Sequence, residues 1–323
     1  MNEHRNVKVV FMGTPVFSVP FLERLVRMGY SVAGVVTQPD RPAGRGYEKM
    51  PSPVRKSAEF LGIPVETPPT LRTVDAFGPI FAWEPDVIVV VAYGKILPKA
   101  ILDRPKWGCI NVHASLLPEL RGASPIQWAV LNGFPETGLT LMRMDEGMDT
   151  GPILAQIPIR LDERETTTSL SEKMTRLGPD FLEKELPLYL SGQRTPMPQS
   201  GQPSLAPLIR KDNGRIPFEK TSLEVDCHVR AMNPWPGAFC ESPFGTLRVI
   251  SGEEDSGTES PEALPGTIVQ AGPGGISFAC GKGVYRIAEL QKPGGRVLSS
   301  REFLTGNRLE PGTRLGAPRN NRS

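Results

Sequence analysis

The first half of the chain alternates short apolar runs with segments of helical periodicity, and this alternation limits the folds open to it. The apolar runs read VKVVFMG (7–13), YSVAGVVT (30–37), DVIVVVAYG (86–94), GCINVH (108–113) and GLTLMRMD (138–145). Between them lie helix-like segments such as VPFLERLVRMG (19–29), KSAEFLG (56–62) and PIQWAVLNG (125–133). Strands that are apolar on both faces must be covered on both faces, as in parallel sheets with crossover helices. The pattern therefore predicts an α/β domain around a parallel sheet, with ligands bound beyond the carboxyl ends of the strands.

The second half of the 323-residue chain has a different pattern, which favours two domains over one. A helical stretch begins at Thr166, and at Ser191 it gives way to a proline-rich segment without periodicity, which is typical of a semi-extended linker. Thr221 and Glu224 then have the spacing of a capping box and predict the start of another helix. Short segments separated by glycine-rich turns follow and predict a small β-barrel: GTLRVIS (245–251), GTIVQAG (266–272), GGISFAC (274–280) and GVYRIAEL (283–290). The expected domains are 1–190 and 211–323, joined by a linker at 191–210.

Several classes of protein are disfavoured by composition and by missing motifs. The longest apolar run, VIVVVAYG, is strand-sized and far short of the ~20 residues of a membrane helix. The N-terminus enters a strand almost at once, so we expect no targeting peptide and a cytoplasmic location. The four cysteines, at 109, 227, 240 and 280, have neither metal-ligand spacing nor disulfide density, so we expect reduced thiols and no metal. Neither a dinucleotide fingerprint nor a P-loop is present, which argues against an oxidoreductase and an NTPase.

Two polar side chains interrupt the apolar strand GCINVH, at Asn111 and His113. Side chains alternate along a strand, so both point to one face, roughly 6–7 Å apart, at the strand end where ligands bind. An amide and an imidazole placed there suit a carbonyl that becomes an oxyanion during acyl transfer. An incidental asparagine beside a hydrogen-bonded strand-end histidine explains the pattern equally well, because no nearby residue has the features of a nucleophile.

A carboxylate that could orient the histidine occurs in MDEGMDTGPIL (144–154). Asp145 ends a predicted strand, and Asp149 lies in a glycine-flanked turn. Aspartates in turns commonly bond only their own backbone. Residue spacing alone therefore leaves the choice between the two open.

A basic loop follows the second predicted strand, in TQPDRPAGRGYEKMPSPVRK (37–56). From residue 41 to 56 it has one acid, Glu48, and five basic residues, namely Arg41, Arg45, Lys49, Arg55 and Lys56. The C-terminal segment 280–323 is also basic, with nine Lys/Arg and three acids. Solvated surface charge explains such runs, but the loop's position at the ligand-binding edge favours contact with a polyanion.

Seven motifs together resemble the folate-dependent formyltransferases, and among them the methionyl-tRNA formyltransferases. They span about Val7 to Gly316 and read FMGTPVFS, TQPDRPAGRG, VVVAYGKILPKAIL, GCINVHASLLPELRGASPIQWAV, MDEGMDTGPIL, NPWPGAF and FLTGNRLEPGTRLG. The Asn-x-His-x-Ser-Leu-Leu-Pro core is shared by all folate-dependent formyltransferases and so indicates the chemistry. The basic loop and the C-terminal domain are the features that point to tRNA.

The resemblance implies a Rossmann-like catalytic domain at 1–190 and an OB-like, tRNA-binding β-barrel at 211–323. It implies an enzyme that transfers the formyl group of 10-formyltetrahydrofolate to the amine of charged initiator methionyl-tRNA. We expect this enzyme to be a monomer that needs no metal and no membrane. Asn111 and His113 would stabilise the tetrahedral intermediate, and Asp149 would orient and charge-stabilise His113 or a bound water. The remaining matches place the folate against Ser115, Leu116, Leu117 and Pro118, and the acceptor end of the tRNA against Arg45. The positive charge of the same loop adds Arg41 and Lys49 as expected tRNA contacts.

Three other functions fit parts of the sequence. A formyltransferase for a small-molecule amine would share the core but would not need the basic loop. A 10-formyltetrahydrofolate hydrolase would use the same three residues with water as acceptor, although its usual form has a long additional dehydrogenase domain. A catalytically silent RNA-binding protein would need only the basic surfaces, and the intact Asn111, His113 and Asp149 argue against it.

Overall fold

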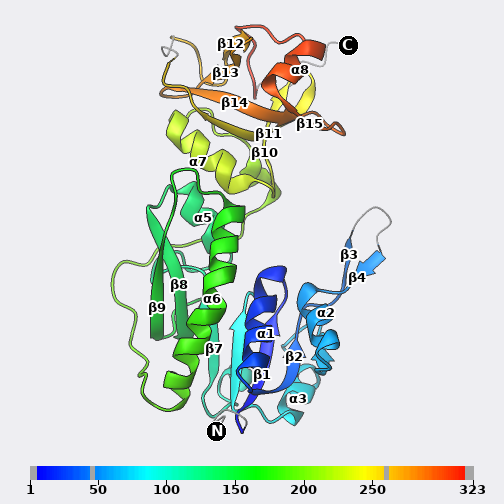
Figure 1. Ribbon diagram of the computed structural model, residues 1–323, viewed down its shortest axis with the longest axis vertical. Helices are drawn as coiled ribbons and strands as arrows, with labels where there is room; N and C mark the ends of the chain where they lie inside the picture. The colour runs from blue at the N-terminus through cyan, green and yellow to red at the C-terminus, as the bar shows by residue number, and fades with distance from the viewer. Residues whose placement is uncertain (1–5, 44–47, 258–261, 317–323) are drawn as a thin grey trace. The chain divides into compact units, whose positions relative to one another are not determined.

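The computed structural model describes residues 6–43, 48–257 and 262–316, and the chain divides into two compact units (Figure 1). The first unit consists of Met1–Pro125, Glu136–Arg160 and Ser171–Pro207. The second consists of Ile126–Pro135, Leu161–Leu170 and Leu208–Ser323. The chain therefore leaves the first unit at residues 126–135 and again at 161–170, and each time it returns to it. The periodicity of the sequence does not predict these two excursions.

A seven-stranded sheet forms the centre of the first unit, in the order β5-β2-β1-β6-β7-β8-β9. Its strands are β1 (Lys8–Gly13), β2 (Ser31–Val36), β5 (Val65–Glu66), β6 (Val87–Val91), β7 (Cys109–His113), β8 (Glu136–Arg143) and β9 (Ile153–Arg160). The five strands from β5 to β7 are parallel, whereas β8 and β9 run antiparallel to their neighbours. The α/β fold class is thus confirmed, but the parallel direction expected for the run at 138–145 is wrong. Apolar periodicity identifies a strand and contains no information on its direction.

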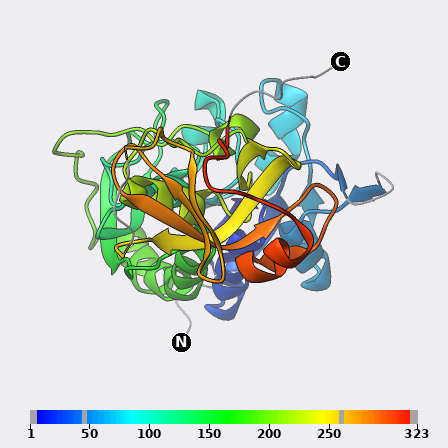
Figure 2. The same cartoon turned by 90° about the horizontal axis from the view of Figure 1, so that it is seen from above.

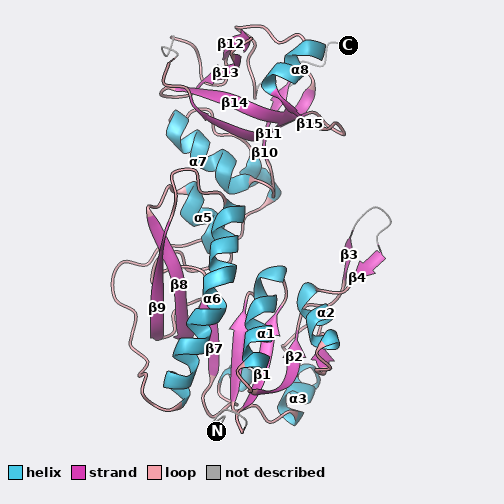
Figure 3. Cartoon of the chain, in the orientation of Figure 1, coloured by secondary structure: helices cyan, strands magenta, loops and turns pink. Residues whose placement is uncertain are grey.

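Helices cover both faces of this sheet, and α1 and α6 lie in front of it in Figure 3. They are η1 (Val16–Ser18), α1 (Val19–Arg27), α2 (Pro53–Phe60), α3 (Val74–Ala82), α4 (Lys99–Leu102) and the greater part of α6 (Thr167–Leu190). On one face, Gly178 of α6 lies so close to Phe21 of α1 that an added Cβ would stand 2.2 Å from the ring. On the other face, Ile80 of α3 and Ile101 of α4 join a fully buried cluster with Ile88 of β6. Burial on both faces explains why the central strands are apolar throughout.

The second unit is built on an antiparallel sheet, which can be followed in yellow and orange in Figure 2. Its pairing order is β10-β11-β14-β13-β12, and β15 also pairs with β14. The strands are β10 (Ala238–Ser242), β11 (Gly245–Glu254), β12 (Ile268–Gly272), β13 (Gly275–Ala279), β14 (Val284–Gln291) and β15 (Val297–Ser299). The helical elements are α5 (Pro125–Leu131, whose Pro125 belongs to the first unit), η2 (Lys211–Gly214), α7 (Ser222–Met232) and α8 (Ser300–Gly306). The four strands expected from the sequence are confirmed, as is the separate small β domain.

The predicted capping box at the start of α7 is also confirmed. The Glu224 N–H donates to Thr221 Oγ1 at 3.2 Å, and the Thr221 N–H donates to Glu224 Oε2 at 2.9 Å. These reciprocal bonds satisfy amides that would otherwise have no partner at a helix N-terminus.

The proline-rich segment at 191–207 is extended, as its composition suggests, but it is bonded along the first unit. Met197 exchanges two backbone hydrogen bonds with Ile153, at 2.7 and 2.8 Å. Further along, the Arg121 N–H donates to the Ser204 carbonyl at 2.9 Å, and the Ala206 N–H donates to the Arg121 carbonyl at 2.7 Å. This part of the chain is therefore an integral edge of the first unit.

No helix in the described part of the chain is long and apolar enough to span a membrane.

Candidate active site

The end of β7 carries the two polar side chains singled out in the sequence. Asn111 and His113 are 9% and 6% exposed, and their spacing of two along a strand directs both to one face. In the neighbouring strands Val90 lies opposite Asn111, and Thr140 lies opposite His113. The pair thus lies in the interior of the sheet, where packing on either side fixes the position of the strand.

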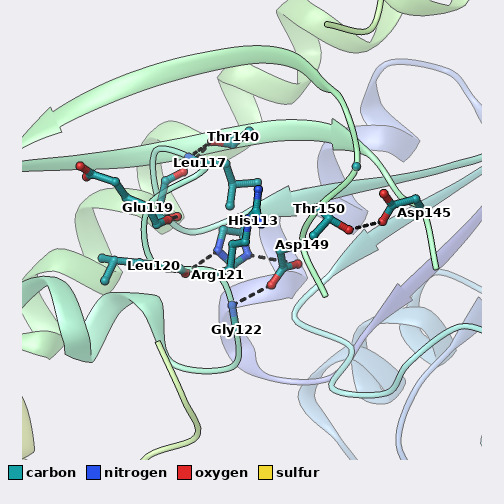
Figure 4. A network of polar contacts seen from close by, with 12 residues as sticks. His113, Leu117, Glu119, Leu120, Arg121, Gly122, Thr140, Asp145, Asp149 and Thr150 are labelled. Carbon is teal, nitrogen blue, oxygen red and sulfur yellow. Dashed lines mark hydrogen bonds and ion pairs between the residues drawn. The ribbon is translucent and has the colours of Figure 1, made fainter. Parts of the chain in front are cut away.

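The imidazole of His113 lies between a carbonyl and a carboxylate (Figure 4). Its Nε2 is 3.0 Å from the Leu120 carbonyl oxygen, and its Nδ1 is 3.6 Å from Asp149 Oδ1. A carbonyl oxygen can only accept, so Nε2 of the neutral ring holds the proton and donates it to Leu120. Nδ1 is then the nitrogen of the neutral ring without a proton, and it faces a carboxylate. The two ring nitrogens consequently have different roles, one anchoring the ring and one available for proton transfer.

The amide of Asn111 has no hydrogen-bond partner among the described residues, and its polar atoms are not fully sealed from solvent. A nearly buried amide normally bonds to protein or water. This amide is therefore free to donate to a ligand that reaches the end of β7.

Asp149 has an unusual backbone that aims its carboxylate into the site. Its φ of 54° is in the left-handed region, which few non-glycine residues adopt. Its Oδ2 accepts a hydrogen bond of 2.8 Å from the Gly122 N–H, which leaves Oδ1 directed at His113. Gly151, two residues later, is so close to the Arg143 carbonyl that an added Cβ would stand 1.9 Å from its oxygen. The turn thus requires glycine at 151 and places Asp149 beside the histidine.

Asp145 does not reach the histidine. Its Oδ1 accepts from the Gly147 N–H at 3.1 Å and from Thr150 Oγ1 at 2.7 Å, both within its own loop (Figure 4). The two aspartates that spacing could not separate therefore differ in space, one facing His113 and the other closing the turn.

The segment Ser115–Pro118 forms the wall next to the histidine, and its polar groups are already bonded. The Ser115 hydroxyl donates to the Glu119 carbonyl at 2.6 Å. The Leu117 N–H donates to Thr140 Oγ1 at 3.1 Å, and the Leu117 carbonyl accepts from Gln156 Nε2 at 2.9 Å. Ser115 and Leu117 are buried, whereas Leu116 and Pro118 are partly exposed. The segment can thus contact a ligand through its shape and its apolar surface more readily than through hydrogen bonds.

A second loop at this edge was not assigned a role from the sequence. It follows β6, and it begins with Ala92 at φ 47° and continues to Gly94 at φ 79°. The Tyr93 carbonyl accepts hydrogen bonds from Thr14 Oγ1 at 3.2 Å and from Gln38 Nε2 at 3.0 Å. Loops that follow three parallel strands are thereby tied together next to β7. The motif VVVAYGKILP marked this loop in the sequence, but its left-handed alanine is visible only in the structure.

The surroundings of β7 disfavour covalent catalysis by the nearest thiol. Cys109 is fully buried, and burial raises the pKa of its thiol to about 12. It is therefore protonated at neutral pH, whereas the thiolate is the nucleophilic form. Among the described residues, no three or more His, Cys, Asp or Glu side chains come together in a way that could hold a metal ion.

Comparison with known families decides to which of them this chain belongs. Residues 6–186 match the formyl transferase family, and residues 208–308 match the formyl transferase C-terminal domain. The chain belongs to the formyl transferase family. The resemblance noted in the sequence is thereby confirmed.

Curated members of the family cover almost the whole chain. The methionyl-tRNA formyltransferase of Bacillus mycoides (strain KBAB4) is 47% identical over 312 residues, or 96% of this chain and 99% of the relative. That of Myxococcus xanthus (strain DK1622) is 45% identical over 307 residues, or 95% of this chain and 97% of the relative. The similarity therefore extends across both units.

Solved structures share the fold at lower identity. The N-formyltransferase of Helicobacter canadensis, in complex with folinic acid and dTDP-3-aminofucose, has a TM-score of 0.62 at 19% identity, over 89% of this chain and 100% of that chain. HypX of Aquifex aeolicus with tetrahydrofolic acid has a TM-score of 0.61 at 17% identity, over 92% of this chain and 46% of that chain. Methionyl-tRNA formyltransferase from Clostridium thermocellum has a TM-score of 0.53 at 16% identity, over 78% of this chain and 95% of that chain.

The basic loop of this family member is a hairpin that projects from the first unit (Figure 1). It consists of β3 (Arg41–Ala43) and β4 (Glu48–Met50), in which Pro42 pairs with Lys49. Arg45 lies outside the described residues, and for Arg41 and Lys49 only the backbone is described. Arg55 is neutralised by ion pairs with Asp40 at 3.0 Å and Glu59 at 2.7 Å. The positive charge expected of the basic loop therefore does not include Arg55, which lies in α2.

Proposed function

We propose that this protein transfers the formyl group of 10-formyltetrahydrofolate to the amino group of methionyl-initiator tRNA, as a cytoplasmic monomer that acts in translation initiation. The geometry that supports this most directly is the His113–Asp149 pair next to the free amide of Asn111. The relatives at 45–47% identity, which are named methionyl-tRNA formyltransferases, support the choice of substrate.

The folate cosubstrate supplies an activated formyl carbon attached to nitrogen. In the proposed reaction the free methionyl amine attacks that carbon, negative charge develops on the formyl oxygen, and the bond to the folate nitrogen then breaks. The Asn111 amide donates a hydrogen bond to the developing oxyanion, which is the usual role of such a fixed donor. His113 accepts on Nδ1 the proton that the attacking amine loses, and the resulting imidazolium stabilises the same charge while Asp149 stabilises the imidazolium. The imidazolium then gives this proton to the folate nitrogen as the bond between that nitrogen and the formyl carbon breaks.

Anchoring of Nε2 on Leu120 has a consequence for this mechanism. The ring cannot turn to present its other nitrogen without losing the 3.0 Å bond to that carbonyl. Proton transfer is therefore confined to the nitrogen that faces Asp149, so the protonated ring always forms beside a negative charge. Direct attack by the amine requires no enzyme nucleophile, which is consistent with the buried, protonated thiol of Cys109.

Ser115, Leu116, Leu117 and Pro118 would border the folate by shape, because the polar groups of Ser115 and Leu117 are already bonded. The loop that begins at Ala92 lies beside the same strand end and would contribute backbone groups. Arg41, Arg45 and Lys49 would contact the acceptor end of the tRNA. The second unit would hold the tRNA body, mainly through phosphates.

Formyl transfer measured with three acceptors tests this proposal. With 10-formyltetrahydrofolate as donor, we expect turnover with charged initiator tRNA and none with free methionine or uncharged tRNA. Transfer to a small amine, such as an amino sugar nucleotide, with no transfer to charged tRNA would instead show a small-molecule formyltransferase. Release of formate without any acceptor would show a hydrolase.

A further inference from the structure

We propose that Gln199, from the proline-rich segment, is a positioning residue of this site that holds Asp149 in place. The inference rests on the function proposed for Asp149 and His113, and it concerns a residue that touches neither the folate nor the amine. Gln199 fastens the backbone around Asp149 to the side chain of Arg121.

Both ends of the Gln199 amide are used. Its Nε2 donates to the Asp149 carbonyl and to the Gly151 carbonyl, each at 2.8 Å. Its Oε1 accepts from Arg121 at 3.1 Å from Nε and at 2.6 Å from one terminal nitrogen. One side chain therefore joins the turn that holds Asp149 to the loop that follows β7.

The turn needs such support because of its backbone conformation. A non-glycine residue with φ near 54° is in a sparsely populated region and stays there only when its surroundings hold it. The Gly122 N–H fixes one carboxylate oxygen of Asp149 but not the main chain. The bonds from Gln199 fix the carbonyl of Asp149 itself and the carbonyl two residues later. The direction of the carboxylate follows from that backbone.

Gln199 is itself held in place on both sides. Two residues earlier, Met197 pairs with Ile153 at the start of β9. Five residues later, the Ser204 hydroxyl accepts from the Leu120 N–H at 2.9 Å, and Leu120 is the residue whose carbonyl anchors His113. The segment thus contacts the surroundings of both the histidine and its aspartate.

The chemistry of the amide suggests an informative substitution. A carboxamide donates from nitrogen and accepts on oxygen, whereas a carboxylate only accepts. Gln199→Glu keeps the size and the contact with Arg121, but it places an acceptor against two carbonyl oxygens. Gln199→Ala removes both ends of the amide. The matched control is Gln202→Ala, because Gln202 is exposed and makes no hydrogen bond with the described residues.

The experiment measures kcat and KM for formyl transfer in the full chain, with thermal melting to verify folding. We expect Gln199→Ala and Gln199→Glu to lower kcat by up to about tenfold, and by no more than Asp149→Ala does, with KM for both substrates nearly unchanged. Gln202→Ala should match the wild type. In a double-mutant cycle, Gln199→Ala should cause little further loss in Asp149→Ala, because its effect acts through that carboxylate.

The outcomes distinguish this inference from the function it rests on. An inactive wild-type protein would refute the proposed function. An active wild type with unchanged kcat in both Gln199 variants would refute the positioning role alone. Multiplicative losses in the Asp149→Ala background, or a rise in KM at constant kcat, would also refute it, because general destabilisation or substrate contact would then explain the effect.

Discussion

His113 and His228 are equally buried, at 6% exposed each, yet their surroundings are opposite. His113 is at the end of β7, and both ring nitrogens face acceptors, the Leu120 carbonyl and the Asp149 carboxylate. His228 is in α7 of the second unit, and its buried Nε2 has no hydrogen-bond partner in the described part of the chain. Burial lowers the pKa of His228, and a hydrogen bond with the Gly214 backbone only partly opposes this. The comparison teaches that the partners of a buried histidine, and not its burial, separate a candidate catalytic group from a packed one.

The strongest test of this contrast is to remove each histidine. His113→Ala should lower kcat by about 10²–10³-fold, because the charge that develops on the formyl oxygen loses a stabilising group. His228→Leu should leave kcat unchanged, since nothing places that ring near the reaction. Steady-state formyl transfer for both variants, with circular dichroism to verify folding, makes the measurement. Equal losses of kcat in the two variants would contradict the assignment of different roles to His113 and His228.

The next test compares the two aspartates of the β8–β9 loop. Asp149→Asn keeps the shape but removes the negative charge opposite Nδ1 of His113, so we expect a loss of about tenfold or more in kcat/KM, or ~1.4 kcal/mol in the barrier. Asp145→Asn affects only the bonds within its loop and should cost much less. Both are measured by kcat/KM under the same conditions. A larger loss in Asp145→Asn would contradict the assignment made from the geometry.

A third test uses the pH dependence of stability. The folded pKa of His228 lies below its ordinary value of 6.5, so the unfolded chain binds more protons between those two values. The contribution of the neutral His228 ring to the free energy of unfolding is therefore complete above pH 6.5. It is lost as the pH falls from 6.5 toward the folded pKa, and over that range the free energy of unfolding drops by about 1.4 kcal/mol per pH unit. Urea unfolding of the wild type and of His228→Leu at several pH values measures the difference. An identical pH slope in the two proteins would show that His228 does not titrate as its burial implies.

The smallest expected effect concerns the helix that carries His228. Thr221→Ala removes the side-chain half of the capping box at the start of α7 and should destabilise the second unit by about 1 kcal/mol. The conservative Thr221→Ser keeps the hydroxyl and should retain most of that stability. Urea midpoints of the two variants provide the comparison. Equal midpoints for the alanine and serine variants would show that this cap contributes little.

Much of the fold could be predicted from the sequence because it depends on local patterns. The central apolar runs predicted strands, and the spacing of Thr221 and Glu224 predicted the start of a helix, and the structure has both. The strand β9 was missed because its residues are mostly half-buried or exposed and its sequence, ILAQIPIR, has no continuous apolar run. The antiparallel direction of β8 is seen only in its pairing with β7 and β9, which are separate segments that no single local window contains.

The strand that presents Asn111 and His113 to one face could be predicted from residue order alone, because side-chain alternation is a local property of an extended chain. The same holds for the apolar residues of that strand, which are buried. The sequence also identified the family, because its motifs extend over both units. Only the tertiary structure distinguished Asp149 from Asp145 by position, since they lie four residues apart in one loop and differ only in which distant groups they meet. Only the tertiary structure brought Gln199 to that loop, 50 residues along the chain from Asp149. Hydrogen bonds between distant segments form only after packing has fixed both partners, so composition and periodicity do not record them.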